Sequence, residues 1–276
     1  MKKNILKKFI GIALITAISV SFVGCGGNKK ASEETLNKIK DNGKVIVGLS
    51  ADYAPYEFHA VIDGKDEVVG FDIDLAREVA KDMGVDLEIK EMEFDPLIGA
   101  LKAGQIDMII SGMNPDEERK KQIDFSDIYY EAKHGVLIKS EDKGKYTKVE
   151  DLNGKKIGAQ LGSTQEKIAQ EKVKDADLQL LANVNNLVLE LKTGKVNALI
   201  TEEPVANMVI KTNPELVLSS IKFEDEGGGN AIGIRKNSPK LLEQLNKTIK
   251  RLKDSGELDK FIVNANDLAA KNQSNS

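Results

Sequence analysis

The strongest constraint on this chain is a ten-residue segment that occurs twice. Residues 101–110 read LKAGQIDMII, and residues 191–200, ninety positions later, read LKTGKVNALI, so seven of ten positions are identical or alike. Each copy has the pattern of a last helical turn, a Gly that ends the helix in a left-handed conformation, and a buried apolar strand. Chance is the competing interpretation, because such units are common. We interpret the repeat as two halves of similar design.

The elements expected around the two copies follow one plan. After a short helix that ends at Gly43, the first half is expected to contain strands at 45–49 and 87–92, helices at 72–83 and 95–104, and then the first repeat strand. The second half is expected to contain strands at 156–159 and 178–181, a helix capped by Ser163 or Thr164, a helix at 185–193, the second repeat strand, a strand at 231–234 and a helix at 238–255. This alternation predicts α/β architecture, with mostly parallel sheets flanked by helices.

A polar loop follows each repeat strand, at 111–114 and at 201–203. Ligands of open α/β sheets bind beyond the carboxyl ends of the strands. Two such loops from similar halves predict one site in a shared cleft. Two connecting segments, near 130–135 and 223–230, would join the halves as a hinge.

The N-terminal residues 1–24 are predicted to be a signal peptide, because four Lys residues precede an uncharged run at 9–24. That run is shorter than the roughly 20 apolar residues of a transmembrane helix. Residues 22–25, FVGC, resemble the lipobox of bacterial lipoproteins, although Phe22 stands where Leu is usual. We therefore expect a palmitate-containing lipid on Cys25, attachment to the extracytoplasmic face of the cell membrane, and a tether at 25–32. An ordinary secretory peptide with a stray Cys is the alternative.

Composition excludes several classes of function. Without residues 1–24 the chain keeps 36 basic and 44 acidic residues, and this acidic balance argues against nucleic acid as a partner. His59 and His134 are the only histidines and Cys25 the only cysteine, so we expect no disulfide, no metal site, no cofactor and no His-based catalytic site. Residues 269–276 are expected to be a flexible polar tail with nothing to bury.

The loops after the strands carry groups that complement a free amino acid. Arg119 offers a planar fork to a carboxylate, and a helix N-terminus at Ser163 and Thr164 adds N–H donors. Glu202 suits an ammonium group, and the rings of Tyr53 and Phe94 suit a side chain. Each residue alone has an ordinary alternative, since a charged run such as the one around Arg119 is usually solvated.

Five motifs resemble the polar amino-acid-binding proteins of ABC importers. They are YAPYEF at 53–58, GFDIDLA at 70–76, ERKK at 118–121 with DFSD at 124–127, GSTQE at 162–166 and EPVA at 203–206. The resemblance implies a two-lobed Venus-flytrap fold of the periplasmic-binding-protein type II, with one lobe at 33–130 plus 228–268 and the other at 131–227. It further implies a monomer that delivers an amino acid to a membrane permease with a cytoplasmic ATPase.

The resemblance also implies the site. In that family the residues matching Arg119 and Thr164 hold the α-carboxylate, and those matching Glu202 and 111–114 hold the α-ammonium. The full expected set of ligand-binding residues is Ser50, Tyr53, Glu57, Phe94, Ser111, Gly112, Met113, Asn114, Arg119, Gln160, Ser163, Thr164, Gln165 and Glu202.

This chain departs from the family pattern at three of these positions. Glu202 stands where Asp is usual and Asn114 where Ser or Thr is usual. Ser50 replaces an Asp found in some binders of basic amino acids, which leaves Glu57 and Glu93 as the acids expected nearest the ligand side chain. The sequence therefore favours a polar or basic amino acid. The alternatives are an enzyme that resembles cyclohexadienyl or arogenate dehydratases on the same scaffold, and an amino-acid-sensing module.

Overall fold

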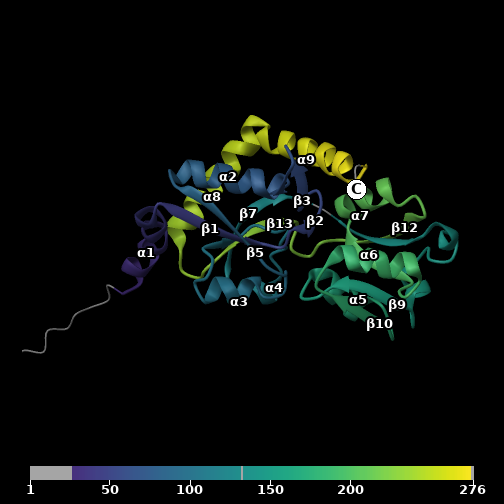
Figure 1. The fold of residues 1–276 in the computed structure, drawn as a ribbon. Coiled ribbons are helices and arrows are strands. Elements are labelled where there is room, and N and C mark those ends of the chain that lie inside the picture. The colour runs from purple at the N-terminus through teal and green to yellow at the C-terminus, as the bar shows by residue number, and fades with distance from the viewer. Residues whose placement is uncertain (1–26, 132, 275–276) are drawn as a thin grey trace, which may run out of the picture.

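In the computed structural model, which describes residues 27–131 and 133–274, two sheets of five strands form the centres of two lobes that lie side by side (Figure 1). The predicted signal peptide at 1–24 and the predicted lipidation site Cys25 lie outside the described residues. Within the described part of the chain, no helix is long and apolar enough to cross a membrane.

The first lobe is built on the sheet β5-β1-β6-β13-β7. Its strands are β1 (Lys44–Leu49), β5 (Asp86–Glu91), β6 (Met108–Ile109), β7 (Asp124–Tyr130) and β13 (Asn230–Ile234). The strands β5, β1 and β6 are parallel, and β13 runs antiparallel to both β6 and β7. The helices of this lobe are α1 (Gly27–Asn42), α2 (Phe71–Met83), α3 (Leu97–Lys102), α4 (Glu117–Gln122), α8 (Pro239–Ser255) and α9 (Glu257–Ser274).

A smaller antiparallel sheet of three strands belongs to the same lobe and was not predicted. Its strands are β2 (Asp52–Tyr53), β3 (Glu57–Ile62) and β4 (Lys65–Val69). Asp63 and Gly64, both with positive φ, form the two-residue turn between β3 and β4. The YAPYEF motif at 53–58 begins in β2 and ends in β3.

The second lobe repeats the plan with the sheet β10-β9-β11-β8-β12. Its strands are β8 (His134–Lys139), β9 (Lys156–Gln160), β10 (Asp177–Leu181), β11 (Ala198–Glu202) and β12 (Leu216–Phe223). The strands β10, β9 and β11 are parallel, and β8 runs antiparallel to both β11 and β12. The helices are α5 (Thr164–Lys172), α6 (Val184–Thr193) and α7 (Glu203–Thr212), with short 3-10 turns at Ser140–Asp142 and Val149–Leu152.

The two copies of the repeated segment occupy equivalent places in the two sheets. Each supplies the middle strand, β6 in the first sheet and β11 in the second. Asp107 in the first copy accepts a hydrogen bond from Ile46 N at 3.1 Å, and the matching Asn197 accepts one from Lys156 N at 3.0 Å. Gly104 and Gly194 end the preceding helical segments with φ of 71° and 77°. The interpretation of the repeat as two similar halves is confirmed.

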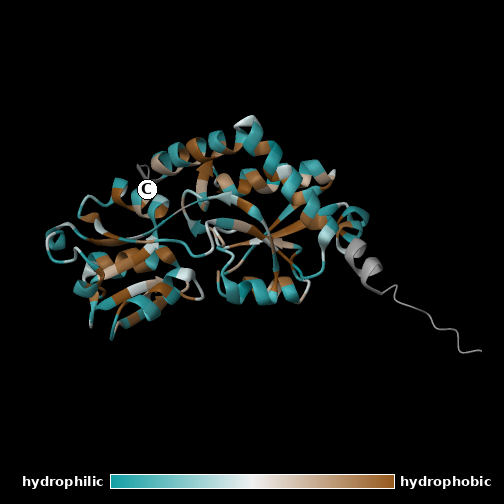
Figure 2. Ribbon diagram, turned by 180° about the vertical axis from the view of Figure 1, so that it is seen from behind, coloured by the Kyte–Doolittle hydropathy of each residue, from teal (hydrophilic) through white to brown (hydrophobic). Residues whose placement is uncertain are grey.

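Hydrophobic residues gather on the strands and on one side of the helices (Figure 2). In α2, for example, Leu75, Val79 and Met83 are buried, whereas Arg77 and Lys81 face solvent. Side chains three and four positions apart share one face of a helix, which explains this division.

The chain crosses between the lobes twice, between β7 and β8 and between β12 and β13. The carboxyl ends of β6 and β11 are thereby held on either side of one cleft.

The two ends of the described chain differ from expectation. Helix α1 begins at Gly27, inside the segment 25–32 that we expected to be a tether. Residues 269–276 were expected to form a tail with nothing to bury, but α9 continues to Ser274 and Ala269 is fully buried beside Phe58 and Met208. The prediction of a tail is wrong here because Leu258, Ala265 and Ala269 belong to an apolar stripe that this helix buries against the rest of the protein. This helix runs across both lobes, from α2 towards α7 (Figure 1).

Candidate ligand-binding site

A small cavity of about 10 Å³ lies between the two lobes. Ten of its eleven lining residues belong to the predicted set, and Asp52 is the addition. Residues from both lobes line the cavity. The lining residues are Ser50, Asp52, Tyr53, Glu57, Phe94, Ser111, Gly112, Asn114, Gln160, Ser163 and Gln165. Its position at the junction of two lobes is typical of small-molecule sites, and its polar lining suits a polar ligand.

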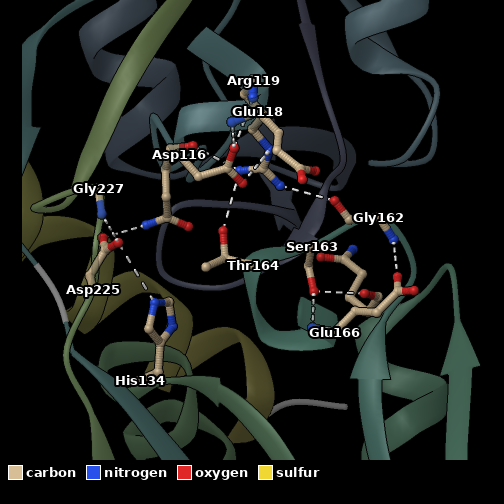
Figure 3. A network of polar contacts seen from close by, with 12 residues as sticks. Asp116, Glu118, Arg119, His134, Gly162, Ser163, Thr164, Glu166, Asp225 and Gly227 are labelled. Carbon is tan, nitrogen blue, oxygen red and sulfur yellow. Dashed lines mark hydrogen bonds and ion pairs between the residues drawn. The ribbon is translucent and has the colours of Figure 1, made fainter. Parts of the chain in front are cut away.

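Arg119 lies in α4, whose first residues are fixed by Asp116, the N-cap that accepts hydrogen bonds from the N–H groups of residues 118 and 119. The side chain is buried and reaches the second lobe, where Nη2 donates to Gly162 O at 2.9 Å (Figure 3). Nη1 donates to Asn114 O at 2.8 Å, and the guanidinium carbon lies 5.3 Å from the Phe94 ring centroid. Burial lowers the pKa of Arg119.

The counter-charge near this guanidinium is weak. Its direct hydrogen-bond acceptors are two carbonyl oxygens and the Thr164 hydroxyl at 3.4 Å, and the Asp116 carboxylate lies 3.8 Å from Nε. A buried cation whose direct hydrogen-bond partners are all neutral is attractive to an anion. The N-terminus of α5 lies at the same place, with Ser163 as its N-cap. Both features suit a carboxylate.

Glu202 ends β11 and is completely buried. Its Oε1 accepts hydrogen bonds from Asn114 Nδ2 at 3.2 Å and Asn230 Nδ2 at 3.1 Å, and its Oε2 accepts one from the Tyr56 hydroxyl. Burial raises the pKa of Glu202. Because its hydrogen-bond partners are neutral, the carboxylate suits a cation such as an ammonium group.

The ring of Tyr53 and the amide of Gln165 close the space between the lobes. The Tyr53 hydroxyl accepts a hydrogen bond from Glu202 N at 3.2 Å and one from Gln165 Nε2 at 3.3 Å. Tyr53 belongs to the first lobe, whereas the other two belong to the second. Ring and amide therefore contact across the cleft.

A group of acids lies on the first-lobe side of the cavity. Glu57 accepts a hydrogen bond from Ser111 Oγ at 2.6 Å, and Asp72 accepts one from Gly112 N at 2.8 Å. Asp52 accepts one from Val184 N, at the start of α6, at 2.6 Å. Burial raises the pKa of Glu57 well above its usual range and raises the pKa values of Asp52 and Asp72 to about 6.

Four predicted residues do not line the cavity itself. Arg119, Thr164 and Glu202 lie directly behind its lining and bond to lining residues or their neighbours. Met113 packs into the apolar cluster of the first lobe with Phe94 and Ile109, so its side chain belongs to the core.

Several polar residues near the site were missed by the sequence analysis. Asp225, in the second connecting segment, accepts a hydrogen bond from Asn114 Nδ2 at 2.7 Å and lies 4.0 Å from His134 Nε2 (Figure 3). Asn230 and Tyr56 hold Glu202 as described above. Tyr56 stands inside the YAPYEF motif, which was a usable signal, but Asp225 stands in no motif.

Comparison with known proteins identifies the class. Residues 45–264 match the bacterial extracellular solute-binding proteins, family 3, and the chain belongs to this family. It is 38% identical over 266 residues to the arginine-binding extracellular protein ArtP of Bacillus subtilis, across 93% of this chain and 96% of that protein. The crystal structure of the amino acid ABC transporter substrate-binding protein AbpA from Streptococcus pneumoniae, bound to L-arginine, has a TM-score of 0.83 and 41% identity and covers 85% of this chain and 99% of that one.

These similarities confirm the predicted two-lobed fold and the predicted role as the substrate-binding subunit of an amino-acid ABC transporter, outside the cytoplasm. They do not support the dehydratase alternative. The structure of AncCDT-1, an ancestral amino-acid-binding protein and a precursor of cyclohexadienyl dehydratase, is 35% identical with a TM-score of 0.74, over 82% of this chain and 97% of that one. It is itself described as a binding protein, so the scaffold alone does not indicate an enzyme.

Proposed function

We propose that this protein binds a free basic L-amino acid, arginine first among them, between its lobes and presents it to a membrane permease driven by a cytoplasmic ATPase. One observation carries the proposal. A buried guanidinium, Arg119, and a buried carboxylate, Glu202, stand beside one cavity, and the hydrogen-bond partners of each are neutral. A zwitterion supplies an anionic acceptor for Arg119 and a cationic donor for Glu202.

The two ends of the ligand are assigned by charge. Arg119 and the N-terminus of α5 at Thr164 would hold the α-carboxylate, and Glu202, with the loop 111–114, would hold the α-ammonium. Tyr53 and Phe94 would flank the ligand side chain, and Glu57 would face its cationic end. The binding of arginine by relatives of 38% and 41% identity supports a basic side chain.

A calorimetric screen of the twenty amino acids tests this proposal. We expect arginine to bind most tightly, and its methyl ester and N-acetyl derivative to bind far more weakly because each lacks one charge. Equal binding of the ester or the acetylated form would contradict the two-ended recognition. Tight binding of an acidic amino acid would contradict the basic side chain.

Ligand binding is proposed to close the two lobes, 33–130 plus 228–268 and 131–227, about the two connecting segments as a monomer. The narrow cavity supports closure, because a ligand held there would be enclosed on both sides. Saturating arginine should reduce the radius of gyration in small-angle scattering. It should also stabilise the fold by about 2.7 kcal/mol at 100 Kd. An unchanged scattering curve would contradict closure.

Attachment through Cys25 is proposed from the lipobox-like residues 22–25. Two acyl chains on one diacylglyceryl group hold a protein at a membrane where a single chain does not. Cys25→Ser should release the protein from the membrane fraction, whereas Ser32→Ala should leave it there. A Cys25→Ser protein that still sediments with membranes would contradict the lipid anchor.

A further inference from the structure

We infer that Glu57 and Asp72 form a carboxyl pair that holds one proton in the ligand-free cavity and releases it when a cationic side chain binds. The pair would thereby act as a specificity element that distinguishes cationic from neutral amino acids. This inference rests on the proposed function, since it requires a basic ligand whose side chain faces Glu57.

The geometry leaves two oxygens of the pair without donors. Glu57, on β3, lines the cavity and is 1% exposed, and Asp72, in the first turn of α2, is 0% exposed. Glu57 Oε1 and Asp72 Oδ2 accept hydrogen bonds, but the other two oxygens, Glu57 Oε2 and Asp72 Oδ1, are buried without a partner. Two ionised carboxylates in this arrangement would repel each other and leave lone pairs unsatisfied. A single proton shared by the pair removes both costs.

The donors around the pair decide which group carries that proton. Asp72 receives the N–H of Gly112 at 2.8 Å and the hydroxyl of Tyr129 at 3.0 Å, two donors to one oxygen. Glu57 receives the Ser111 hydroxyl alone. Burial and then the Asp72 carboxylate raise the pKa of Glu57 well above its usual value, and a hydrogen bond to Asp72 adds in the same direction. Since Glu57 has fewer donors than Asp72, we assign the proton to Glu57.

The charged groups that act on the pair are themselves acids. Asp52, on β2, acts on Glu57, and Glu202, on β11, acts on Asp72. The titratable group in direct contact from β7 is the hydroxyl of Tyr129, a neutral donor. The surroundings thus favour retention of the proton until a cation enters from the cavity.

Binding then exchanges one positive charge for another. A guanidinium next to Glu57 stabilises the ionised carboxylate, and the proton passes to solvent, so the charge of the cavity region stays the same. Citrulline, the neutral analogue of arginine with nearly the same shape, gives no such stabilisation. By linkage, arginine affinity should rise by up to tenfold per pH unit while Glu57 is protonated in the free protein, whereas citrulline affinity should not.

The test is calorimetry of the wild-type protein with arginine and with citrulline, at pH 6.0 and 7.5, in phosphate and in imidazole buffers, whose ionisation enthalpies differ. We expect arginine to release close to one proton and citrulline to release close to none. Because both ligands carry the same α-ammonium and α-carboxylate, the difference reports the side-chain end alone. Arginine binding without net proton release at either pH would overturn the inference and leave the proposed function intact. If arginine does not bind at all, the proposed function fails, and the inference fails with it.

Three variants locate the proton. Glu57→Gln should bind arginine without proton release, and its preference for arginine over citrulline should no longer depend on pH. Asp72→Asn offers a carboxamide donor to Glu57, which should then be ionised before binding and release fewer protons. Glu67→Gln removes an exposed acid from the neighbouring strand β4 and should keep the wild-type proton count. Proton release by Glu57→Gln equal to that of wild type would overturn the assignment, and the wild-type measurement stands even if one variant does not fold.

Discussion

The two copies of the repeated segment begin alike and end differently at the cleft. In the first lobe, β6 ends at Ile109, and an irregular segment leads to the N-cap of α4 at Asp116. In the second lobe, β11 continues to Glu202, and α7 starts at the next residue. The first copy is therefore followed at the cleft by the backbone groups of an irregular segment and then by the guanidinium of Arg119 in α4. The second presents a carboxylate directly from the strand.

Each lobe anchors the recognition charge of the other. Arg119, from the first lobe, donates to Gly162 O of the second, and Glu202, from the second lobe, accepts from Tyr56 and Asn114 of the first. Opening the cleft would remove these contacts from both charges at once. The asymmetry of two similar lobes is thus suited to a ligand whose two ends have opposite charge, and each end can be tested separately.

Removal of the first-lobe charge should have the largest effect. Arg119→Ala takes away the fork for the α-carboxylate and should weaken arginine binding by about 3–5 kcal/mol, because the ligand carboxylate would be buried unpaired. Lys120→Ala, an exposed neighbour paired with Glu117, should change binding by less than about 1 kcal/mol. Calorimetry with arginine and its methyl ester gives the comparison. If Arg119→Ala discriminates acid from ester as well as wild type does, Arg119 does not contact the carboxylate.

Removal of the second-lobe charge should follow closely. Glu202→Gln keeps the shape but leaves the α-ammonium without a counter-charge, at a cost of about 3–4 kcal/mol. Its matched control is Glu203→Gln, because Glu203 pairs with Lys222 at 2.7 Å. Calorimetry with arginine and N-acetylarginine distinguishes the two. A larger loss for Glu203→Gln than for Glu202→Gln would contradict the assignment of the ammonium site.

A smaller effect is expected on the free energy of unfolding, and it should depend on pH. It involves Asp52, which contacts the start of α6. Its pKa is raised to about 6, mainly by burial, so the folded protein binds this proton more tightly than the unfolded chain does. Asp52 should therefore destabilise the fold above pH 6, and this cost should disappear as the pH falls towards 4.

Denaturant unfolding of wild type and Asp52→Asn, between pH 4 and 7, measures this cost. The variant should gain about 2–3 kcal/mol relative to wild type as the pH rises across that range, since each pKa unit corresponds to about 1.4 kcal/mol. A gap that stays constant with pH would show that the pKa of Asp52 is not raised in the folded protein.

Much of the fold was readable from local patterns. Apolar runs such as 45–49 and the Gly that follows each repeated helix predicted strands and helix ends within a few residues. The hairpin β3–β4 was missed although Asp63-Gly64 is a typical two-residue turn. Helix α9 was missed although Leu258, Ile262, Ala265 and Ala269 recur at helical spacing.

The site was predictable where a motif carried it and unpredictable where distant segments meet. Burial of Arg119 depends on the carbonyl of Gly162, which stands forty-three positions away, and a charged run gives no sign of it. Glu202 and Glu203 look alike in sequence, but one is fully buried and the other pairs with a lysine. The contact of Asp225 with Asn114 spans 111 positions and two lobes, so no local pattern could indicate it.

Substitution of the aromatic residues of the first lobe should have the smallest effect on binding. Tyr53 and Phe94 would contact the ligand side chain through area and cation–π attraction, worth roughly 0.5–2 kcal/mol, rather than through its charged ends. Tyr53→Leu and Phe94→Leu should therefore reorder the preference among arginine, lysine and citrulline without abolishing binding. Phe223→Leu, half-buried in the core of the second lobe, should leave that order unchanged. Since the Phe94 ring also lies 5.3 Å from Arg119, Phe94→Leu should weaken all three ligands slightly, and Tyr53→Leu should be the more selective change. Calorimetry with the three ligands measures the order, and an order that neither substitution alters would show that the side chain is recognised by the acids alone.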